Sequence, residues 1–410
     1  MTPGSARHRT PSAPPPRPAG SHAGARNVLV MSAAVFLLIA GEQLWSRFLP
    51  VYLVALGAPA VVLGLWGSSK DFLDAALQYP GGALSDRYGN QRALLVFTAI
   101  AGLGYLAYRL AGAWPVLFLG LLLASAWTSL ASPAMFALVA ESLPPGRRAR
   151  GFLIQSVLRR VPMIFAPALG GLLVERLGLQ VGLRVGFTVS CVLAVITLWF
   201  QRRFYVAPAA PAANRVHGLL ATWRRASSPL KRLLVADVLA RAAESMADVF
   251  VVVYAIDHLH AGAAQYGAWV GLQMAVSIAS YFPGAWMAER FGRRPPVIIT
   301  FVMFAAYPLL VGLSRDAGML TWAFVAGGLR ELGEPARKSM IVDASPADAR
   351  GQTVGAYYLA RSVMILPAGA IGGLLWARHI HAPFWLAATI GAVGVVYFTL
   401  AFREPAVETA

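Results

Sequence analysis

Twelve blocks of about twenty apolar residues follow one another along this chain of 410 residues, separated by polar connections. A helix of that length, rising ~1.5 Å per residue, crosses a hydrocarbon layer ~30 Å thick. The chain is 58% hydrophobic and only 13% charged, whereas a soluble domain is roughly 45–50% apolar. We therefore predict an all-α polytopic membrane protein. Its twelve transmembrane helices are expected at residues 28–55, 60–84, 92–111, 115–140, 151–175, 181–200, 230–257, 265–287, 296–313, 319–342, 352–377 and 383–402.

A membrane-spanning β-barrel is disfavoured by the same blocks. They lack the apolar and polar alternation of barrel strands, and many contain Gly and Pro. Spanning helices tolerate both residues, because neighbouring groups can satisfy the freed backbone.

The net charge of +17 is carried by the connections and not by a basic domain. Arginines gather in alternate connections, as at 147–150, 202–203 and 290–294, and the opposite connections hold few. The positive-inside rule then places both termini in the cytoplasm. We expect a multi-pass protein of the plasma (inner) membrane that does not bind nucleic acid.

Cys191 is the only cysteine, and it lies in an apolar run. A disulfide framework and a thiolate metal cluster are therefore excluded, and we expect no metal and no other cofactor. The opening residues 1–26 contain no apolar segment before a cleavage site, so they are typical of a disordered cytoplasmic tail and not of a signal peptide.

A Pro/Ala- and Arg-rich stretch divides the apolar blocks into two sets of six. We predict an N-terminal six-helix bundle at 27–200, a cytoplasmic linker at 201–229, a C-terminal six-helix bundle at 230–403 and a cytoplasmic tail at 404–410.

The two sets of six also match each other in sequence. A single offset of 202 residues relates polar and small residues of the first half to the second, which chance rarely produces for polar positions. The offset maps Glu42 onto Glu244, Arg159 onto Arg361, and Gly170 and Gly171 onto Gly372 and Gly373. Two such bundles form parallel repeats related by an axis along the membrane normal, and they can rock about a central site.

Residues 82–89, GALSDRYG, resemble the G-x-L-x-D-R-x-G signature that major facilitator superfamily transporters carry between helices 2 and 3. Residues 289–294, ERFGRR, resemble its weaker copy between helices 8 and 9. The resemblance implies the superfamily's fold of two pseudo-symmetric bundles. It also implies a conformational-switch motif made of Gly82, Asp86, Arg87, Gly89, Glu289, Arg290, Gly292 and Arg293.

The first copy departs from the family pattern, because Asn90 and Gln91 stand where two basic residues usually follow the glycine. Physically, Asp86 lies where it can meet a cation or the positive end of a neighbouring helix. Such a charge lock at the cytoplasmic face would favour an outward-open state. The alternative is a simple topology signal of arginine after a helix end.

Residues 166–171, APALGG, resemble the G-P-x-x-G-G element that the superfamily's antiporters, chiefly drug exporters, carry in helix 5. Pro167 can bend the helix, and Gly170 and Gly171 let another helix approach closely. The element indicates export, although the similar stretch at 366–376 shows that duplication alone can preserve the pattern.

Charged residues within the spans mark the expected site, because each costs about 2.5–3.5 kcal/mol at mid-bilayer and needs a cavity or a partner. The repeat suggests two pseudo-symmetric pairs, Glu42 with Arg159 and Glu244 with Arg361. These pairs could couple proton binding to movement, or they could be structural ion pairs. The residues expected at the proton-coupling site or central cavity are Glu42, Asp71, Arg159, Glu244, Asp248, Glu331, Glu334 and Arg361.

The sequence thus predicts a secondary transporter and not an enzyme, because no H-E-x-x-H, G-x-S-x-G or phosphate-binding loop is present. The first hypothesis is a monomeric, proton-driven antiporter that exports amphipathic or drug-like small molecules. The alternative is a proton symporter or facilitator that imports a small metabolite. The partners expected are the substrate, the proton and the lipid bilayer.

Overall fold

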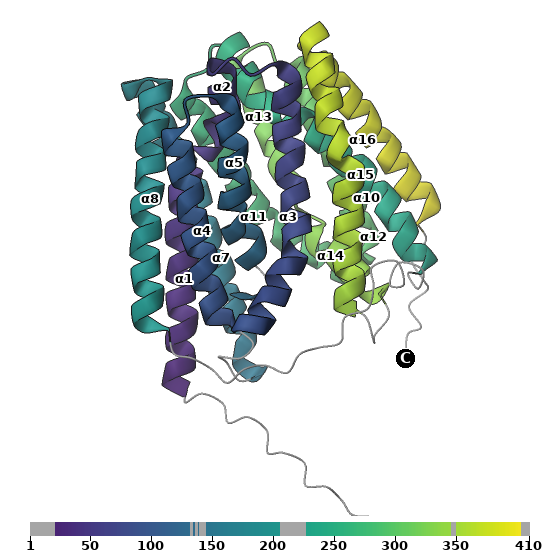
Figure 1. Cartoon of the computed structure of the whole chain (residues 1–410). Helices are drawn as coiled ribbons and strands as arrows, with labels where there is room; N and C mark the ends of the chain where they lie inside the picture. The colour runs from purple at the N-terminus through teal and green to yellow at the C-terminus, as the bar shows by residue number, and fades with distance from the viewer. Residues whose placement is uncertain are drawn as a thin grey trace, which may run out of the picture.

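The structure is a computed structural model that describes residues 21–131, 134, 135, 138, 145–205, 227–345 and 350–402. It is a bundle of long helices with no strand among these residues (Figure 1). The elements of the first half are α1 (Ser21–Gln43), η1 (Ser46–Phe48), α2 (Leu49–Ala55), α3 (Ala60–Tyr88), α4 (Asn90–Leu110), α5 (Trp114–Ser125), η2 (Ala126–Leu130), α7 (Pro145–Leu177) and α8 (Leu179–Phe204). The elements of the second half are α10 (Ser228–Val253), η3 (Tyr254–His258), α11 (Ala263–Phe291), α12 (Arg294–Leu313), α13 (Ala317–Leu329), α14 (Glu334–Asp343), α15 (Arg350–Arg378) and α16 (Ala382–Ala401).

The predicted all-α architecture of twelve spans is confirmed, and several spans are irregular inside. Residues 28–55 form three pieces, α1, η1 and α2, and Pro50 lies in the first turn of α2, where its missing N–H costs no intrahelical bond. Residues 319–342 divide into α13 and α14 around the break at 330–333. Both η2 and η3 are π turns, which often mark functional positions in helices.

Glycine at positive φ follows three of the long helices, α3, α7 and α11. Gly89 follows α3 at φ +85° and Gly292 follows α11 at φ +86°. Residues with a Cβ rarely adopt this left-handed region, so these two positions require glycine to stop the helix and turn the chain. Both glycines belong to the predicted switch motif.

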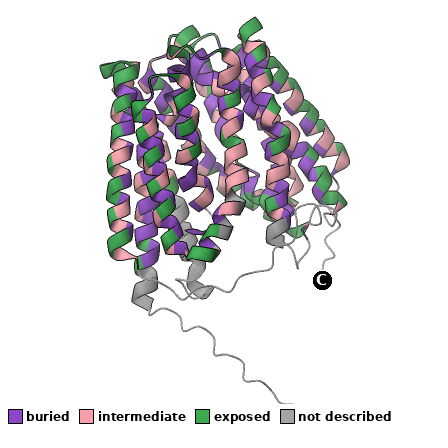
Figure 2. Cartoon of the chain, viewed as in Figure 1, coloured by how far each residue is buried: buried purple, intermediate pink, exposed green. Residues whose placement is uncertain are grey.

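Among the residues that the structure describes, six helices are long and apolar enough to be recognised as membrane helices by length and composition alone: Arg26–Ala55, Asn90–Leu110, Leu179–Phe204, Arg294–Leu313, Thr353–Arg378 and Ala382–Ala401. Others, such as α3 and α10, contain intramembrane charges. Large apolar side chains such as Leu110, Trp199 and Leu400 are exposed on the outside of the bundle, as a lipid-facing surface requires (Figure 2).

Two ends of the molecule can be told apart. We call the end with residues 89, 205, 292–293 and 402 the terminal end, because α1 begins there and α16 ends there (Figure 1). The far end carries the connections at 56–59, 111–113, 259–262, 314–316 and 379–381.

The helices pack mainly within their own half of the chain. In the first half α1 packs on α7 and α8, and α4 on α5 and α8; in the second half α16 packs on α10 and α12. The two halves meet along α3 with α15 and along α7 with α11. One apolar core runs through both halves, and a second lies within the second half. Residues 1–20, 206–226 and 403–410 lie outside the described part of the chain. They include the predicted C-terminal tail, most of the predicted linker and most of the predicted N-terminal tail, whose residues 21–26 instead belong to α1.

Candidate functional site

Backbone contacts between small residues join α3 to α15 near the far end. A Cβ built on Gly64 would lie 1.7 Å from the carbonyl oxygen of Gly369, so neither helix has room for a side chain here. Ser68 completes the contact, because its Oγ accepts the Gly369 N–H at 3.1 Å and lies 3.2 Å from the Oγ of Ser245. Small residues and hydroxyl hydrogen bonds are the usual means by which helices associate in lipid.

The second contact between the halves uses the helix-5 element. A Cβ on Gly171 would lie 2.2 Å from the carbonyl oxygen of Ala263, and one on Gly267 would lie 2.2 Å from that of Pro167. Gly170 instead packs on Leu44 within the first half. At the far end of the seam between α7 and α11, a helix of the other half therefore approaches Gly171 closely.

Glycines nearer the terminal end pack differently. Gly81 contacts Leu130 within the first half, and Gly284 contacts Leu332 within the second. The close glycine contacts between the halves thus belong to the far end, and the helices spread toward the terminal end (Figure 1).

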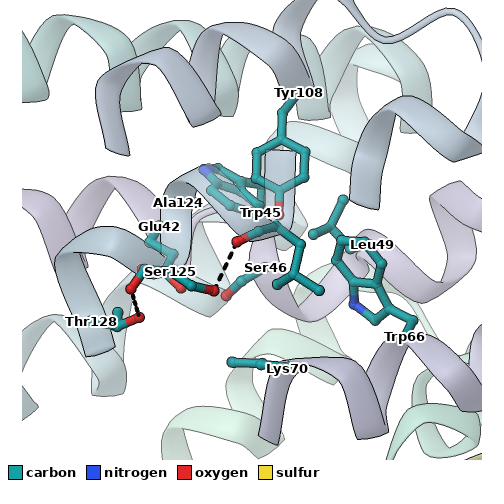
Figure 3. Close-up of a pocket in the computed structure, with 11 residues that line it drawn as sticks. Glu42, Trp45, Ser46, Leu49, Trp66, Lys70, Tyr108, Ala124, Ser125 and Thr128 are labelled. Carbon is teal, nitrogen blue, oxygen red and sulfur yellow. Dashed lines mark hydrogen bonds between the residues drawn. The ribbon is translucent and has the colours of Figure 1, made fainter. Parts of the chain in front are cut away.

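A small cavity of about 40 Å³ lies within the first half, beneath Trp45, Trp66 and Tyr108 (Figure 3). Its polar lining consists of Glu42 on α1, Lys70 on α3, and the hydroxyl residues Ser46, Ser125 and Thr128. Such a volume holds a few water molecules but no organic substrate.

Glu42 has no hydrogen bond or ion pair within the described part of the chain. The charged side chains that act on it electrostatically are Lys70, Asp74, Arg159 and Arg47. Arg159, which is exposed, likewise has no ion pair among the described residues. The predicted pair of Glu42 with Arg159 is therefore not formed in this conformation, because the two side chains remain apart.

The charges of the second half form a continuous network. Arg337 donates to Asp237 Oδ2 at 2.6 Å and to both carboxylate oxygens of Glu334 at 2.7 Å. Asp237 also accepts from the Tyr357 hydroxyl at 3.1 Å and from Arg361 Nη1 at 3.3 Å. The side chains of Asp237 and Arg337 are each 1% exposed, so this is a buried ion pair.

The network continues toward the seam through Glu244. Arg241 donates to Glu244 Oε2 at 2.8 Å, and Arg330 donates to Glu244 Oε1 at 3.1 Å. Arg330 also lies 3.8 Å from Asp248. The predicted pair of Glu244 with Arg361 was wrong for this conformation, because Glu244 is held by these two arginines and Arg361 by Asp237.

The two halves differ sharply at corresponding positions. At the offset of 202 residues, the network residues Asp237, Arg241, Asp248, Arg330 and Arg337 correspond to Val35, Ile39, Ser46, Thr128 and Met135. Only Glu244 and Arg361 keep charged counterparts, Glu42 and Arg159. The duplicated Glu and Arg are thus embedded in ion pairs in one half and left without them in the other.

A polar chain crosses between the halves near mid-membrane. Arg160 on α7 donates to the Tyr281 hydroxyl at 2.7 Å, and its guanidinium lies 4.8 Å from that ring. Tyr281 on α11 in turn donates to Glu331 Oε2 at 3.1 Å. Asp71 on α3 is exposed and has Glu244 and Arg241 of the other half as charged neighbours.

The switch-motif residues lie at the terminal end. Arg87, Glu289 and Arg290 are exposed, and Arg293 forms an ion pair with Asp343 at the end of α14. The surroundings of Gly82 and Asp86, which belong to α3, lie outside the part of the chain whose side chains are described.

Asp237 and Tyr281 are among the residues of this arrangement that sequence reasoning missed. Asp237 stands four residues before Arg241 in an otherwise apolar stretch, and that spacing on a helix is a signal that could have found it. Tyr281 gave no signal, because a single tyrosine does not stand out in an aromatic-rich chain.

Histidines gather at the far end, outside the spans. The ring of His381 lies 5.5 Å from that of His379 and 5.4 Å from that of Tyr254. Burial and the neighbouring His379 lower the pKa of His381 below its ordinary value. No group of three or more metal-ligating side chains occurs among the described residues.

The family model of the Major Facilitator Superfamily matches residues 31–239 and 233–410. The chain is 28% identical over 129 residues to the Multidrug resistance protein 1 of Bacillus subtilis, covering 31% of this chain and 33% of that protein. It is 23% identical over 150 residues to the Quinolone resistance protein NorA of Staphylococcus aureus, covering 37% and 39%. The similarity therefore spans only a third or so of the curated relatives' lengths.

Solved structures share the fold over nearly the whole chain. A mutant of the nucleoside transporter NupG superposes with a TM-score of 0.76 at 13% identity, covering 92% of this chain and 100% of that one. A peptide transporter POT in complex with sulfate superposes with a TM-score of 0.71 at 18% identity, covering 92% of this chain and 93% of that one. The human organic anion transporter MFSD10 gives 0.63 at 16% identity, with 91% and 99% covered. At such identities the likeness concerns the fold alone.

Proposed function

The chain belongs to the Major Facilitator Superfamily, and on that premise we propose that it exports small amphipathic or drug-like molecules by alternating access in exchange for protons. The coarser part, a membrane-spanning transporter, follows from the family and the fold. The direction of transport, its coupling to protons and the class of substrate are what we propose in addition.

Alternating access is supported by where the two halves touch. The contacts of Gly64 with Gly369 and of Gly171 with Ala263 lie at the far end, so the conformation described here is one that is closed at that end. We propose that both termini are cytoplasmic, which makes this an inward-facing state. Rocking of residues 27–200 against 230–403 would separate these contacts and close the terminal end instead.

We propose that the switch motif controls that closure. In the second half, the ion pair of Arg293 with Asp343 ties the α11–α12 turn to α14 at the terminal end. In the first half, Asp86 and Arg87 occupy the corresponding place, with Asn90 and Gln91 in place of the basic pair. The motif would bias the two states and would bind no substrate.

Glu42 is the residue we propose for the proton, and this is the observation that carries the coupling. It faces a cavity with room for water, and no arginine within the described residues holds it in an ion pair. A carboxylate so placed can gain and lose a proton without breaking a salt bridge. Glu244 is bound by two arginines, so it is the less suitable site despite being its counterpart.

Asp71, Asp248, Glu331 and the exposed Arg159 are proposed to face the central cavity and to contact substrate. Glu334 and Arg361 belong to the ionic network, and we propose that they act there as structural residues. The protein would work as a monomer, because each chain supplies both halves of the site.

Export rather than import is supported by the curated relatives, which are named for multidrug and quinolone resistance, and by the helix-5 element at the seam. The test is accumulation of fluorescent amphipathic compounds in cells with and without the protein. We expect lower accumulation with the protein, abolished when the proton gradient is collapsed. Net uptake would instead favour the alternative, a proton symporter or facilitator for a metabolite.

A further inference from the structure

One side chain of the first half completes a helix of the second half at the far end. Glu175 lies in the last turn of α7, and its Oε1 accepts the backbone N–H of Ala264 at 2.9 Å. Ala264 is the second residue of α11, a helix of 29 residues. The N–H groups of the first turn have no partner within their own helix, so each depends on a cap or on water.

The local sequence of α11 supplies no cap of its own. Its N-cap residue is Gly262, which has no side chain to accept these hydrogen bonds. A Cβ built on Gly262 would lie 2.4 Å from Glu175 Oε1. Glycine therefore leaves the space that the carboxylate of the other half occupies, and the negative charge lies at the positive end of the helix dipole.

The contact has no counterpart on the other seam. The repeat that relates the halves places Ala377 at the position of Glu175 and Val62 at that of Ala264. There α3 begins after Pro59 without a side-chain cap. The cap is thus a feature of one seam only and does not follow from the duplication.

We infer that Glu175 is a latch that stabilises the state closed at the far end. The carboxylate and the helix it caps belong to opposite halves, so the hydrogen bond exists only while α7 and α11 stay together at this end. When the halves separate there, the amides of α11 and the carboxylate return to water. The latch therefore stabilises the state that is closed at the far end and does not stabilise the other state.

The inference rests on the proposed alternating access but on no particular substrate or coupling ion. A side-chain N-cap contributes an amount that corresponds to a shift of about 2- to 30-fold in the ratio of two states. Loss of Glu175 should accordingly raise the fraction of molecules open at the far end by a factor in that range.

Pulsed electron spin resonance on the full chain in lipid measures that ratio without substrate. Spin labels on Leu110→Cys and Met319→Cys, in a Cys191→Ala background, report the distance between exposed positions of α4 and α13 at the far end. The measurement is repeated with Gly369→Ala, which weakens the other seam and populates both states.

We expect Glu175→Ala to enlarge the longer-distance population, and Glu175→Gln, which keeps an oxygen acceptor but loses the charge, to enlarge it less. Arg176→Ala, at the exposed neighbour, should leave the ratio unchanged. Two populations whose ratio is the same in Glu175→Ala as in the parent would overturn the latch while leaving alternating access intact. A single distance in every variant would contradict the proposed rocking itself.

Discussion

Asp237 and Arg337 form an ion pair at 2.6 Å between two side chains that are each 1% exposed. Glu334 accepts from the other two nitrogens of the Arg337 guanidinium. Tyr357 and Arg361 donate to the same oxygen, Asp237 Oδ2, and Asp237 Oδ1 has no partner among the described residues. The corresponding residues of the first half are Val35 and Met135. One half of the transporter is therefore built on ionic contacts where the other is built on apolar packing.

We expect Asp237→Val alone to destabilise the protein by about 3–5 kcal/mol, because it leaves the Arg337 charge buried without its partner. The double variant Asp237→Val with Arg337→Met reproduces the residues of the first half and should lose less than the two single changes added together. Unfolding midpoints in detergent, measured for the three variants, check this. Simple additivity would mean that the pair contributes nothing as a pair.

The seam between α3 and α15 should not tolerate a methyl group. A Cβ on Gly369 would lie 2.1 Å from the carbonyl oxygen of Gly64, so Gly369→Ala should force the far end open and reduce turnover. Gly355→Ala lies on the same helix, where a Cβ meets nothing within 4 Å, and serves as the control. The two variants are distinguished by how fast a membrane-impermeant reagent labels a cysteine introduced at the seam between α3 and α15. Equal labelling in both variants would show that the contact does not form the seal.

The hydrogen-bonded bridge from Arg160 through Tyr281 to Glu331 depends on one atom, the Tyr281 hydroxyl oxygen. Tyr281→Phe keeps the ring beside Arg160 but removes both hydrogen bonds, each of which contributes on the order of 0.5–1.5 kcal/mol, or more with a charged partner. We expect slower transport and a lower unfolding midpoint, because both hydrogen bonds to charged partners are lost. Tyr307→Phe, in which the ring contact with Arg330 is kept, tests whether loss of any tyrosine hydroxyl near a charge has the same effect.

The far-end histidines should make stability depend on pH. The pKa of His381 is lowered from its ordinary value of 6.5, first by burial and then by His379. The unfolded chain therefore binds this proton more readily than the folded one, so stability is retained above pH ~6.5 and falls as the pH drops below that value. Thermal unfolding of His381→Gln between about pH 8 and pH 5 should show a smaller decline than the parent. An identical decline would assign the effect to other groups.

The sequence was a good guide wherever a property belongs to one segment. Each of the twelve predicted spans is largely helical over its described residues, because length and apolar content are properties of the segment itself. The glycines that end α3 and α11 could also be predicted from the local sequence, because each follows helix-forming residues and adopts a conformation that favours glycine. The break at 330–333 was not anticipated, although the polar residues and glycine of RELG interrupt the apolar run there and Pro335 follows.

The ion-pair partners of the charged residues could not be predicted from the sequence in the same way. Duplication suggested symmetric pairs, yet Glu244 is bound by Arg241 and Arg330, and Arg361 by Asp237. A repeat preserves the position of a residue but not the identity of its neighbours. Asp237, whose counterpart in the first half is Val35, binds Arg361 and so keeps it from pairing with Glu244. The cap of α11 by Glu175 joins residues 89 positions apart, and no local pattern connects them.

In the proposed mechanism, substrate leaves in exchange for a proton carried by Glu42. The most direct measurement is substrate-driven proton movement in proteoliposomes, followed with an internal pH dye, for the parent, Glu42→Gln and Glu244→Gln. We predict that Glu42→Gln abolishes proton movement while substrate still binds and exchanges. Glu244→Gln should keep proton movement at a reduced rate, because it disturbs the ionic network without removing the proton site. Unchanged proton movement in Glu42→Gln would contradict the account.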